Sequence, residues 1–283
     1  MNRLFVDNLT VIDFSYFHPV RGIVGESWIV DVELSGELDE QGMVFDFGHV
    51  KKQLKALIDT DVDHKLVVPS QLPGLLIKKD AKQLDIGFHG ANNERWIHRS
   101  PADSVLLLAC ADVTPEALSE YIADMLTQAL PPNVDGVGLT IRAEVIDGAF
   151  YHYSHGLKKH QGNCQRIAHG HRSKIEIYLN DIRDPQLEKE WADRFKDIYI
   201  GTKEDIVNLA SPNVSNAYSF AYQSQQGSFK LTLPARQVYI MNTDTTVELI
   251  AHHIADQVKL DYPDKQVTVK AFEGVGKGAI AEA

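Results

Sequence analysis

The sequence predicts an α+β protein in which one unit, strand–strand–helix–helix–strand–strand, occurs twice. Three observations support this prediction. Short motifs recur in the same order in both halves, and both alternating strand patterns and helical apolar stripes occupy corresponding places. A single match could arise by chance, but the shared order indicates a tandem duplication. We expect the first unit to cover residues 1–147 and the second unit to cover residues 148–283.

The repeated motifs frame one helix in each half. In the first half, residues 101–105 precede a strand-like run and then a helix start at Thr114. In the second half, residues 234–238 precede a similar run and a helix start at Thr246. Another strand is expected after each helix. Asp147-Gly148 is a hairpin signal and joins the two halves almost without a linker.

Individual elements follow from the spacing of apolar residues. Residues 30–34 alternate between apolar and other side chains, as in a strand with one buried face. Within residues 49–60 and 246–259, the apolar side chains fall on one helical face. Thr114 is a good helix N-cap, and Pro115 suits the first helical position, where its missing N–H costs nothing.

Two regions fit the repeat less well. Residues 74–99 and residues 181–228 look like insertions, and neither carries a recognisable motif.

Composition and charge limit the classes of function. Hydrophobic residues make up 44% of the 283 residues, as in globular proteins, and the net charge of -11 argues against general nucleic-acid binding. No apolar run approaches the roughly 18 residues needed to cross a bilayer. The N-terminus lacks the pattern of a signal peptide, so we expect a cytoplasmic protein with no membrane partner. Cys110 and Cys164 are too few for a secreted disulfide framework.

The segment between residues 155 and 171 is the most informative for chemistry. His169 and His171 are two residues apart before an alternating strand, so both side chains project to the same face. His155 ends the preceding strand, and antiparallel pairing would return it to the same place. Three histidines with one open position are typical of a catalytic zinc site. The alternative is a polar loop with surface histidines.

Cys164 lies among these histidines and allows three roles. It could be a fourth zinc ligand that closes a structural site, a buried structural thiol, or a nucleophile or base. The surrounding segment from residue 148 to 175 contains no acidic residue but five cations, namely Lys158, Lys159, Arg166, Arg172 and Lys174. This local positive charge is compatible with a solvated loop and equally with a phosphorylated substrate.

Several motifs together resemble a known family. Residues 151–157 contain aromatic and small residues around His155, Cys164 follows, and His169-Gly170-His171 opens a strand. Residues 36–47 have the form G-x5-G-x3-D-F, Val62-Asp63-His64 is close to L-D-H, and Thr114-Pro115-Glu116 is close to P-T-x-E. This set resembles the 6-pyruvoyl-tetrahydropterin synthase / 6-carboxytetrahydropterin synthase family. The resemblance covers most of both halves except the two insertions.

The resemblance implies the tunnelling fold (T-fold), in which antiparallel four-stranded sheets with two helices on one side join edge to edge in a homo-oligomer. It implies a zinc-dependent lyase that acts on 7,8-dihydroneopterin triphosphate, a small pterin. The product would be 6-carboxytetrahydropterin, on the route to queuosine, or 6-pyruvoyltetrahydropterin. Two alternatives stay open: a non-catalytic pterin- or purine-binding module with structural zinc, and a metal-dependent hydrolase of another heterocycle.

The family motifs are divided between the halves. In the first half, His18 remains as the counterpart of the first zinc histidine, but residues 24–26 read Val-Gly-Glu in place of His-Gly-His. In the family, a catalytic cysteine works with an Asp-His pair at a site between subunits. The resemblance therefore implies that Asp63 and His64 of one half meet Cys164 and the zinc of the other, with one metal per chain. The alternative for His64 is a helix-end histidine capped by its neighbour.

The resemblance also implies substrate-binding residues. The family anchors the pterin ring with a glutamate, whose two oxygens can accept from a ring N–H and an exocyclic amine. Glu273 lies five residues before Gly278, as the family pattern requires, and is the expected anchor. Glu144 is the second candidate, although its spacing is one residue short. Independently of the resemblance, Arg166 is expected to contact the substrate as part of the local positive charge, which would suit a phosphorylated substrate.

Overall fold

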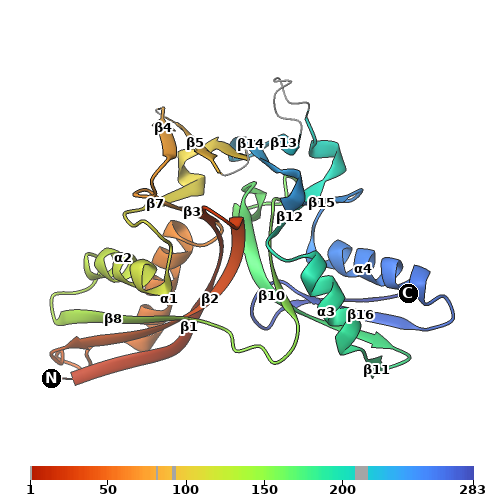
Figure 1. Ribbon diagram of the computed structural model, residues 1–283. Coiled ribbons are helices and arrows are strands. Elements are labelled where there is room, and N and C mark those ends of the chain that lie inside the picture. Colours follow the sequence, from red (N-terminus) through yellow and green to blue (C-terminus); the bar gives the residue numbers. More distant parts are fainter. Residues whose placement is uncertain (1, 81, 91–93, 208–215) are drawn as a thin grey trace.

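The structure is a computed structural model that describes residues 2–80, 82–90, 94–207 and 216–283. Two sheets with helices lie side by side at the base of the molecule, and a third sheet lies above them (Figure 1). None of the helices in these ranges is both long and apolar enough to cross a membrane.

The N-terminal half forms the first sheet, whose strand order is β7-β3-β1-β2-β8. The strands are β1 (Asn2–His18), β2 (Gly22–Gly36), β3 (Leu66–Pro69), β7 (Val105–Leu108) and β8 (Val134–Ala143). Helices α1 (Phe47–Asp61) and α2 (Pro115–Thr127) pack on this sheet through the predicted apolar stripes. The side chain of Thr114 accepts a hydrogen bond from the backbone N–H of Ala117, which confirms the predicted cap.

The C-terminal half repeats the same plan in the order β15-β12-β9-β10-β16-β17, with β11 attached to β10. Its strands are β9 (Phe150–His155), β10 (His169–Leu179), β11 (Ile182–Arg183), β12 (Ile198–Thr202), β15 (Val238–Met241), β16 (Val267–Phe272) and β17 (Gly278–Glu282). Helices α3 (Pro185–Arg194) and α4 (Val247–Asp261) pack on it. Strand for strand, the first five match the first sheet, so the predicted duplicated α+β fold is confirmed.

The insertion predicted over residues 181–228 is wrong in its first part. This range contains α3 and β12, which are the counterparts of α1 and β3. The helix is hard to recognise because Glu188 interrupts its apolar face. Glu188 is buried because its carboxylate accepts hydrogen bonds from the backbone N–H of Ile177 (3.1 Å) and from Arg183 Nε (2.7 Å).

The two insertions combine in the third sheet, whose order is β13-β14-β6-β5-β4. The first insertion supplies β4 (Leu75–Lys79), β5 (Gln83–His89) and β6 (Arg95–Pro101), and the second supplies β13 (Ala217–Ser224) and β14 (Gly227–Pro234). Strands β6 and β14 are antiparallel neighbours, with His98 opposite Leu231. This sheet therefore links the two halves. Residues 81, 91–93 and 208–215 of the insertions lie outside the described residues.

Equivalent residues of the two units meet where β1 and β2 lie against β9 and β10. Ser15 Oγ is 2.7 Å from Ser154 Oγ, and a Cβ on Gly170 would lie 2.7 Å from the Cα of Gly25. In the hairpins, Ser15 pairs with Gly25 as Ser154 pairs with Gly170. The units are thus related by an approximate two-fold axis at this contact.

The hairpin registers correct one predicted correspondence. Counting from Ser15 and Ser154, the residue equivalent to His155 is Tyr16 and not His18, which lies two positions further along β1. The prediction aligned the sequences around His18 and His155 by residue similarity, whereas strand pairing decides which residues are equivalent. Val24 and Glu26 do occupy the positions of His169 and His171, as predicted.

Candidate active site

Three buried histidines come together on one face of the β9–β10 hairpin. His155 and His169 are directly opposite in the register, and His171 follows two residues later on the same face. Each is at most 1% exposed. One possible ligand nitrogen from each lies within 4.8 Å of the other two. The structure therefore brings together all three residues that the sequence predicts as metal ligands.

The Nδ1 atoms of these three histidines face oxygen atoms of the protein. His155 Nδ1 is 2.8 Å from the carbonyl oxygen of Thr245, and His169 Nδ1 is 2.9 Å from that of Arg166. His171 Nδ1 is 3.2 Å from Asp13 Oδ1, a close contact that lacks the geometry of a hydrogen bond. Oxygen partners at Nδ1 leave Nε2 available to a metal ion.

The Nε2 atoms of these histidines are suited to bind a metal ion. Nε2 of His155 and Nε2 of His171 are buried and have no hydrogen-bond partner. Burial lowers the pKa of His155 and His169 well below its ordinary value, so both rings are neutral, which is the form that binds metal. Buried unsatisfied nitrogen atoms are rare in proteins, and a bound ion would satisfy them.

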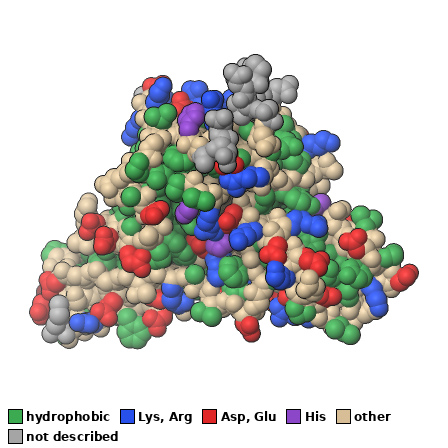
Figure 2. Space-filling view, viewed as in Figure 1, with side chains coloured by type: hydrophobic (Ala, Val, Ile, Leu, Met, Phe, Trp, Pro, Cys, Tyr) green, Lys and Arg blue, Asp and Glu red, His purple; other side chains and the backbone are tan. Residues whose placement is uncertain are grey.

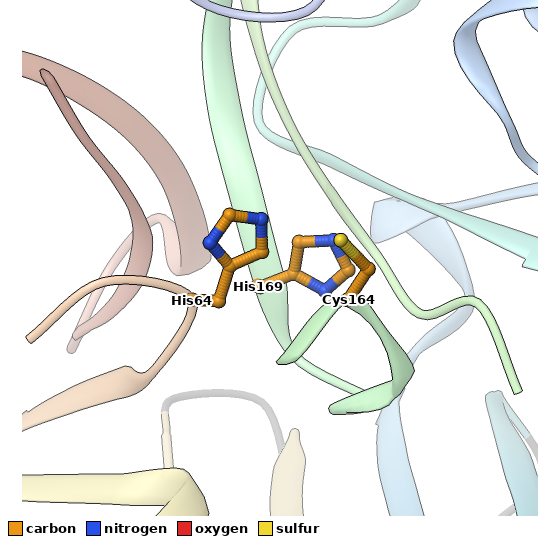
Figure 3. A group of neighbouring side chains, drawn as sticks. All are labelled: His64, Cys164 and His169. Carbon is orange, nitrogen blue, oxygen red and sulfur yellow. The ribbon is translucent and has the colours of Figure 1, made fainter. Parts of the chain in front are cut away.

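A second group of side chains adjoins the first through His169. Figure 3 shows His64 and Cys164 beside the His169 ring, and the possible ligand atoms of these three residues lie within 4.8 Å of one another. His64 follows α1 in the first unit, whereas Cys164 lies in a short 3₁₀ turn between β9 and β10 of the second unit. The His64 ring stacks on His169 with 5.0 Å between centroids.

Local structure holds His64 in this position. Its backbone is in the left-handed region (φ 56°), and its N–H donates to the carbonyl oxygen of Asp13 (2.7 Å). Its Nδ1 is 2.5 Å from Asp63 Oδ2. Burial alone would lower the pKa of His64, but its hydrogen bonds with Asp63 and Cys164 raise it to about 10. The ring thus faces the thiol and His169, in contrast to the alternative of a histidine that only ends a helix.

Arg166 contacts the segment that carries Asp63 and His64. Its guanidinium donates to the backbone carbonyl oxygens of Asp63 (3.2 Å) and His64 (3.5 Å), and its Nε donates to Gln226 Oε1 (3.3 Å). Arg166 is buried, and these contacts hold the Asp63–His64 segment in place. Its role in substrate binding stays a prediction.

The predicted positive field around Cys164 is partly neutralised. Lys158 pairs with Asp205 (2.5 Å), and Lys159 pairs with Asp244 (2.9 Å). Figure 2 shows Lys, Arg and His side chains near the middle of the face, with acidic side chains among them. Acidic partners from distant parts of the chain could not be assigned from the local sequence.

The hairpin β13–β14 forms hydrogen bonds with the loop that carries Cys164. The backbone N–H of Gln226 donates to Gln165 Oε1 (2.9 Å), and its side-chain amide donates to Asn163 Oδ1 (2.9 Å). Tyr222 donates its hydroxyl hydrogen to the carbonyl oxygen of Gln165 (2.9 Å). The second insertion thus orders both residues that flank Cys164.

The two predicted glutamates lie in different surroundings. Glu273 Oε1 is 3.8 Å from His171 Nε2, at the edge of the histidine group. Glu144 contacts Arg172 through its carbonyl oxygen (2.7 Å) and has its carboxylate 3.8 Å from Lys174. The strand registers place Ala143, and not Glu144, at the position equivalent to Glu273. The structure therefore brings Glu273 to the site and leaves Glu144 outside it.

Sequence reasoning did not identify Asp13 and Lys277. Asp13 is 3% exposed, and Lys277 Nζ lies 2.9 Å from its Oδ2. Burial would raise the pKa of Asp13, but His171 and Lys277 hold it below its ordinary range. A signal was present, because Asp13 is a charged residue within the apolar run Val11-Ile12-Asp13-Phe14.

The position equivalent to this site in the first unit is filled by protein. The registers place Asp197 (φ 54°) where the other side has His64. Arg21 donates to both carboxylate oxygens of Asp197 (2.6 and 2.9 Å) and to the hydroxyl of Tyr16 (2.9 Å). In the described part of the chain, both groups of possible metal ligands include His169 and lie on the other side of the two-fold axis.

Comparisons with known proteins agree with this architecture. The family model for 6-pyruvoyl tetrahydropterin synthase matches the chain twice, over residues 11–144 and 144–282. A 6-carboxy-5,6,7,8-tetrahydropterin synthase from Aquifex aeolicus is 29% identical over 136 residues, which are 46% of this chain and 74% of the relative. A protein from Methanocaldococcus jannaschii, provisionally given the same name, is 31% identical over 140 residues, which are 47% of this chain and 82% of the relative.

Solved structures are also similar to the chain. The crystal structure of 6-pyruvoyl tetrahydropterin synthase from Plasmodium vivax is 18% identical in sequence, and the TM-score is 0.41. The match covers 50% of this chain and 90% of that one. Because the family model matches both halves, the chain belongs to the 6-pyruvoyl tetrahydropterin synthase family, as a tandem-duplicated, synthase-like lyase.

Proposed function

We propose that this chain is a zinc-dependent lyase of pterin metabolism that acts on 7,8-dihydroneopterin triphosphate. The observation that supports it best is the pair of buried, unsatisfied Nε2 atoms, on His155 and His171, beside a Cys164–His64–Asp63 group. The names of the curated relatives favour 6-carboxytetrahydropterin as the product over 6-pyruvoyltetrahydropterin.

In this proposal the active site is shared between the units. Residues 1–147 supply Asp63 and His64, and residues 148–283 supply Cys164 and the three histidines. His155, His169 and His171 would hold Zn²⁺ through Nε2. When bound, the ion supplies Lewis acidity that makes hydroxyl groups of the substrate side chain easier to deprotonate.

Cys164 and His64 would move protons. The Cys164 thiolate would accept a proton from the substrate side chain. His64, which is protonated because its pKa is raised to about 10, would stabilise the thiolate and donate a proton back to the substrate. Asp63 holds the His64 ring through Nδ1, so that Nε2 is directed away from Asp63. Triphosphate would leave as the C–O bond breaks, and formation of 6-carboxytetrahydropterin would also release the two outer side-chain carbons as a two-carbon aldehyde, with water as the co-reactant. Glu273, 3.8 Å from His171, would accept hydrogen bonds from the pterin ring.

The geometry favours a catalytic metal over a structural one. Cys164 shares a group with His169 and His64, but the group that contains His155 and His171 includes no cysteine. Three histidines without a thiolate leave the fourth position of a tetrahedral zinc site open to substrate. This supports the lyase over the binding module with structural zinc.

We also propose a homo-oligomer. The outer strands of the two basal sheets are β7 and β8 in one and β15 and β17 in the other. Open strand edges are templates for pairing with another chain. Light scattering on the purified chain would measure its mass, and a monomer at all concentrations would contradict this part of the proposal.

The main test is turnover of dihydroneopterin triphosphate by wild type, Cys164→Ala and His64→Ala, together with a zinc count. We expect one zinc per chain and a loss of at least about 100-fold in turnover for each variant. Cys110→Ala is the matched control, because Cys110 packs near the first-unit core and should leave turnover unchanged. Full activity in both site variants would show that the shared site is not the catalytic one.

A further inference from the structure

A buried carboxylate lies in the middle of an apolar strand of the first unit. Asp13 on β1 has Ile12 and Phe14 as fully buried neighbours and is itself 3% exposed. A buried carboxylate is costly unless charged or hydrogen-bonding groups compensate it. Ser27 Oγ donates to its Oδ1 (2.5 Å), and Lys277 Nζ donates to its Oδ2 (2.9 Å).

A third contact of this carboxylate, like the contact with Lys277, crosses to the second unit. Oδ1 lies 3.2 Å from His171 Nδ1. The other two histidines face neutral carbonyl oxygens at Nδ1, on Thr245 and Arg166. Among the three, His171 is thus the ring that faces a negative charge. A negative charge close to Nδ1 of a ligating histidine favours the tautomer with hydrogen on Nδ1 and makes Nε2 more basic.

The backbone of Asp13 holds the acid–base pair. Its N–H donates to Asp63 Oδ1 (2.9 Å), and its carbonyl oxygen accepts from the N–H of His64 (2.7 Å). The second bond supports His64 in its left-handed conformation. One residue therefore contacts a histidine of the metal group through its side chain and Asp63–His64 through its main chain.

In the equivalent pair on the other side of the two-fold axis, the acidic residue and the histidine are exchanged. By register, His152 is equivalent to Asp13, and Glu26 is equivalent to His171. His152 Nδ1 lies 3.5 Å from Glu26 Oε2. The acid and the imidazole have exchanged places, so that the acid supports the ring in one site and replaces it in the other.

We propose that Asp13 is a positioning residue that orients His171 for the metal and fixes the distance between the metal and the Asp63–His64 pair. This inference rests on the proposed zinc site. It explains why the unit without metal-binding histidines keeps a charged residue in the interior of an apolar strand.

The test is zinc affinity of the full chain, measured by competition with a chromophoric chelator. Asp13→Asn keeps an oxygen acceptor for Ser27 but removes the charge behind His171. We expect affinity to fall by about 10- to 100-fold. Cobalt(II) absorption provides a second readout, because a change in ligand basicity shifts its bands without any need for turnover. Asp31→Asn is the matched control, since Asp31 pairs with Arg142 on the first sheet (2.9 Å).

The outcomes separate this inference from the proposed function. Wild-type affinity and an unchanged cobalt spectrum in Asp13→Asn would overturn it. Tight zinc binding by wild type without turnover would contradict the lyase, while the affinity of the variant would still decide the role of Asp13. Wild type that binds no zinc would overturn both. Unchanged circular dichroism of the metal-free variant would exclude general unfolding as the cause of a lower affinity.

Discussion

His98 provides a quantitative test of how the third sheet contributes to stability. It lies on β6, is 4% exposed, and its Nδ1 has no hydrogen-bond partner. Phe17, Phe88 and Trp96 line the same apolar region. Burial lowers the pKa of His98 from 6.5 to about 4. The protonated ring is thus strongly disfavoured in the folded chain.

The sign of the effect follows from linkage. Above pH 6.5 the ring is neutral in both states, and the free energy of unfolding does not depend on its titration. As the pH falls below 6.5 the unfolded chain binds the proton first, so stability is lost. At about 1.4 kcal/mol per pKa unit, the loss is about 2 kcal/mol at pH 5 and about 3 kcal/mol by pH 4.

The perturbation is His98→Leu, which removes the titration and keeps an apolar side chain. We would compare the urea unfolding of metal-free wild type and variant at pH 7.5 and pH 5, followed by tryptophan fluorescence. The variant should lose about 2 kcal/mol less than wild type between these pH values. His89→Leu is the control, because His89 lies exposed on the neighbouring strand β5. If His98→Leu and wild type show the same pH dependence, His98 is not buried as described.

Two further predictions concern the contact between the units and the Cys164 loop. Gly25→Ala should prevent stable folding, because its Cβ would lie 1.8 Å from the carbonyl oxygen of Tyr153. Gly138→Ala is the control and should be tolerated, because no atom would lie nearer than 3.7 Å to its Cβ. Comparable thermal midpoints for the two variants would contradict this prediction. Gln226→Ala removes the side-chain amide bonds to Asn163 and Arg166 but keeps the backbone bond to Gln165. At about 1 kcal/mol for each lost bond, turnover should fall by roughly 10-fold through loss of order around Cys164, and zinc affinity should not change; unaltered turnover would show that these contacts have no role in catalysis.

The group of three histidines could be predicted from sequence because its geometry is local. The spacing of His169 and His171 fixes their common face, and hairpin pairing returns His155 to it. The approach of His64 to Cys164 could not be derived from spacing. It was expected only because the family resemblance placed such residues on different subunits. Fusion converts that contact between subunits into one between the halves of a chain.

The third sheet and the role of Asp13 depend on contacts between distant segments. Strand β6 pairs with β14, which lies more than a hundred residues later in the chain, and neither strand has a sequence motif that identifies its partner. Asp13 contacts His171 across the two-fold axis, and no local pattern encodes that distance. The mistaken equivalence of His18 has the same origin, because register is set by pairing across the hairpin.

The division of labour between the units follows from the fusion itself. In an oligomer of identical subunits, each position near a two-fold axis must serve both sites with the same residue. Here the equivalent positions differ: Asp197 is the equivalent of His64, and Glu26 is the equivalent of His171. Gly25 and Gly170 remain the same because both strands must approach closely at the contact. In the proposed shared site, Asp63 and His64 of one unit could therefore specialise toward the three histidines of the other, while Arg21 occupies the equivalent place on the other side of the axis.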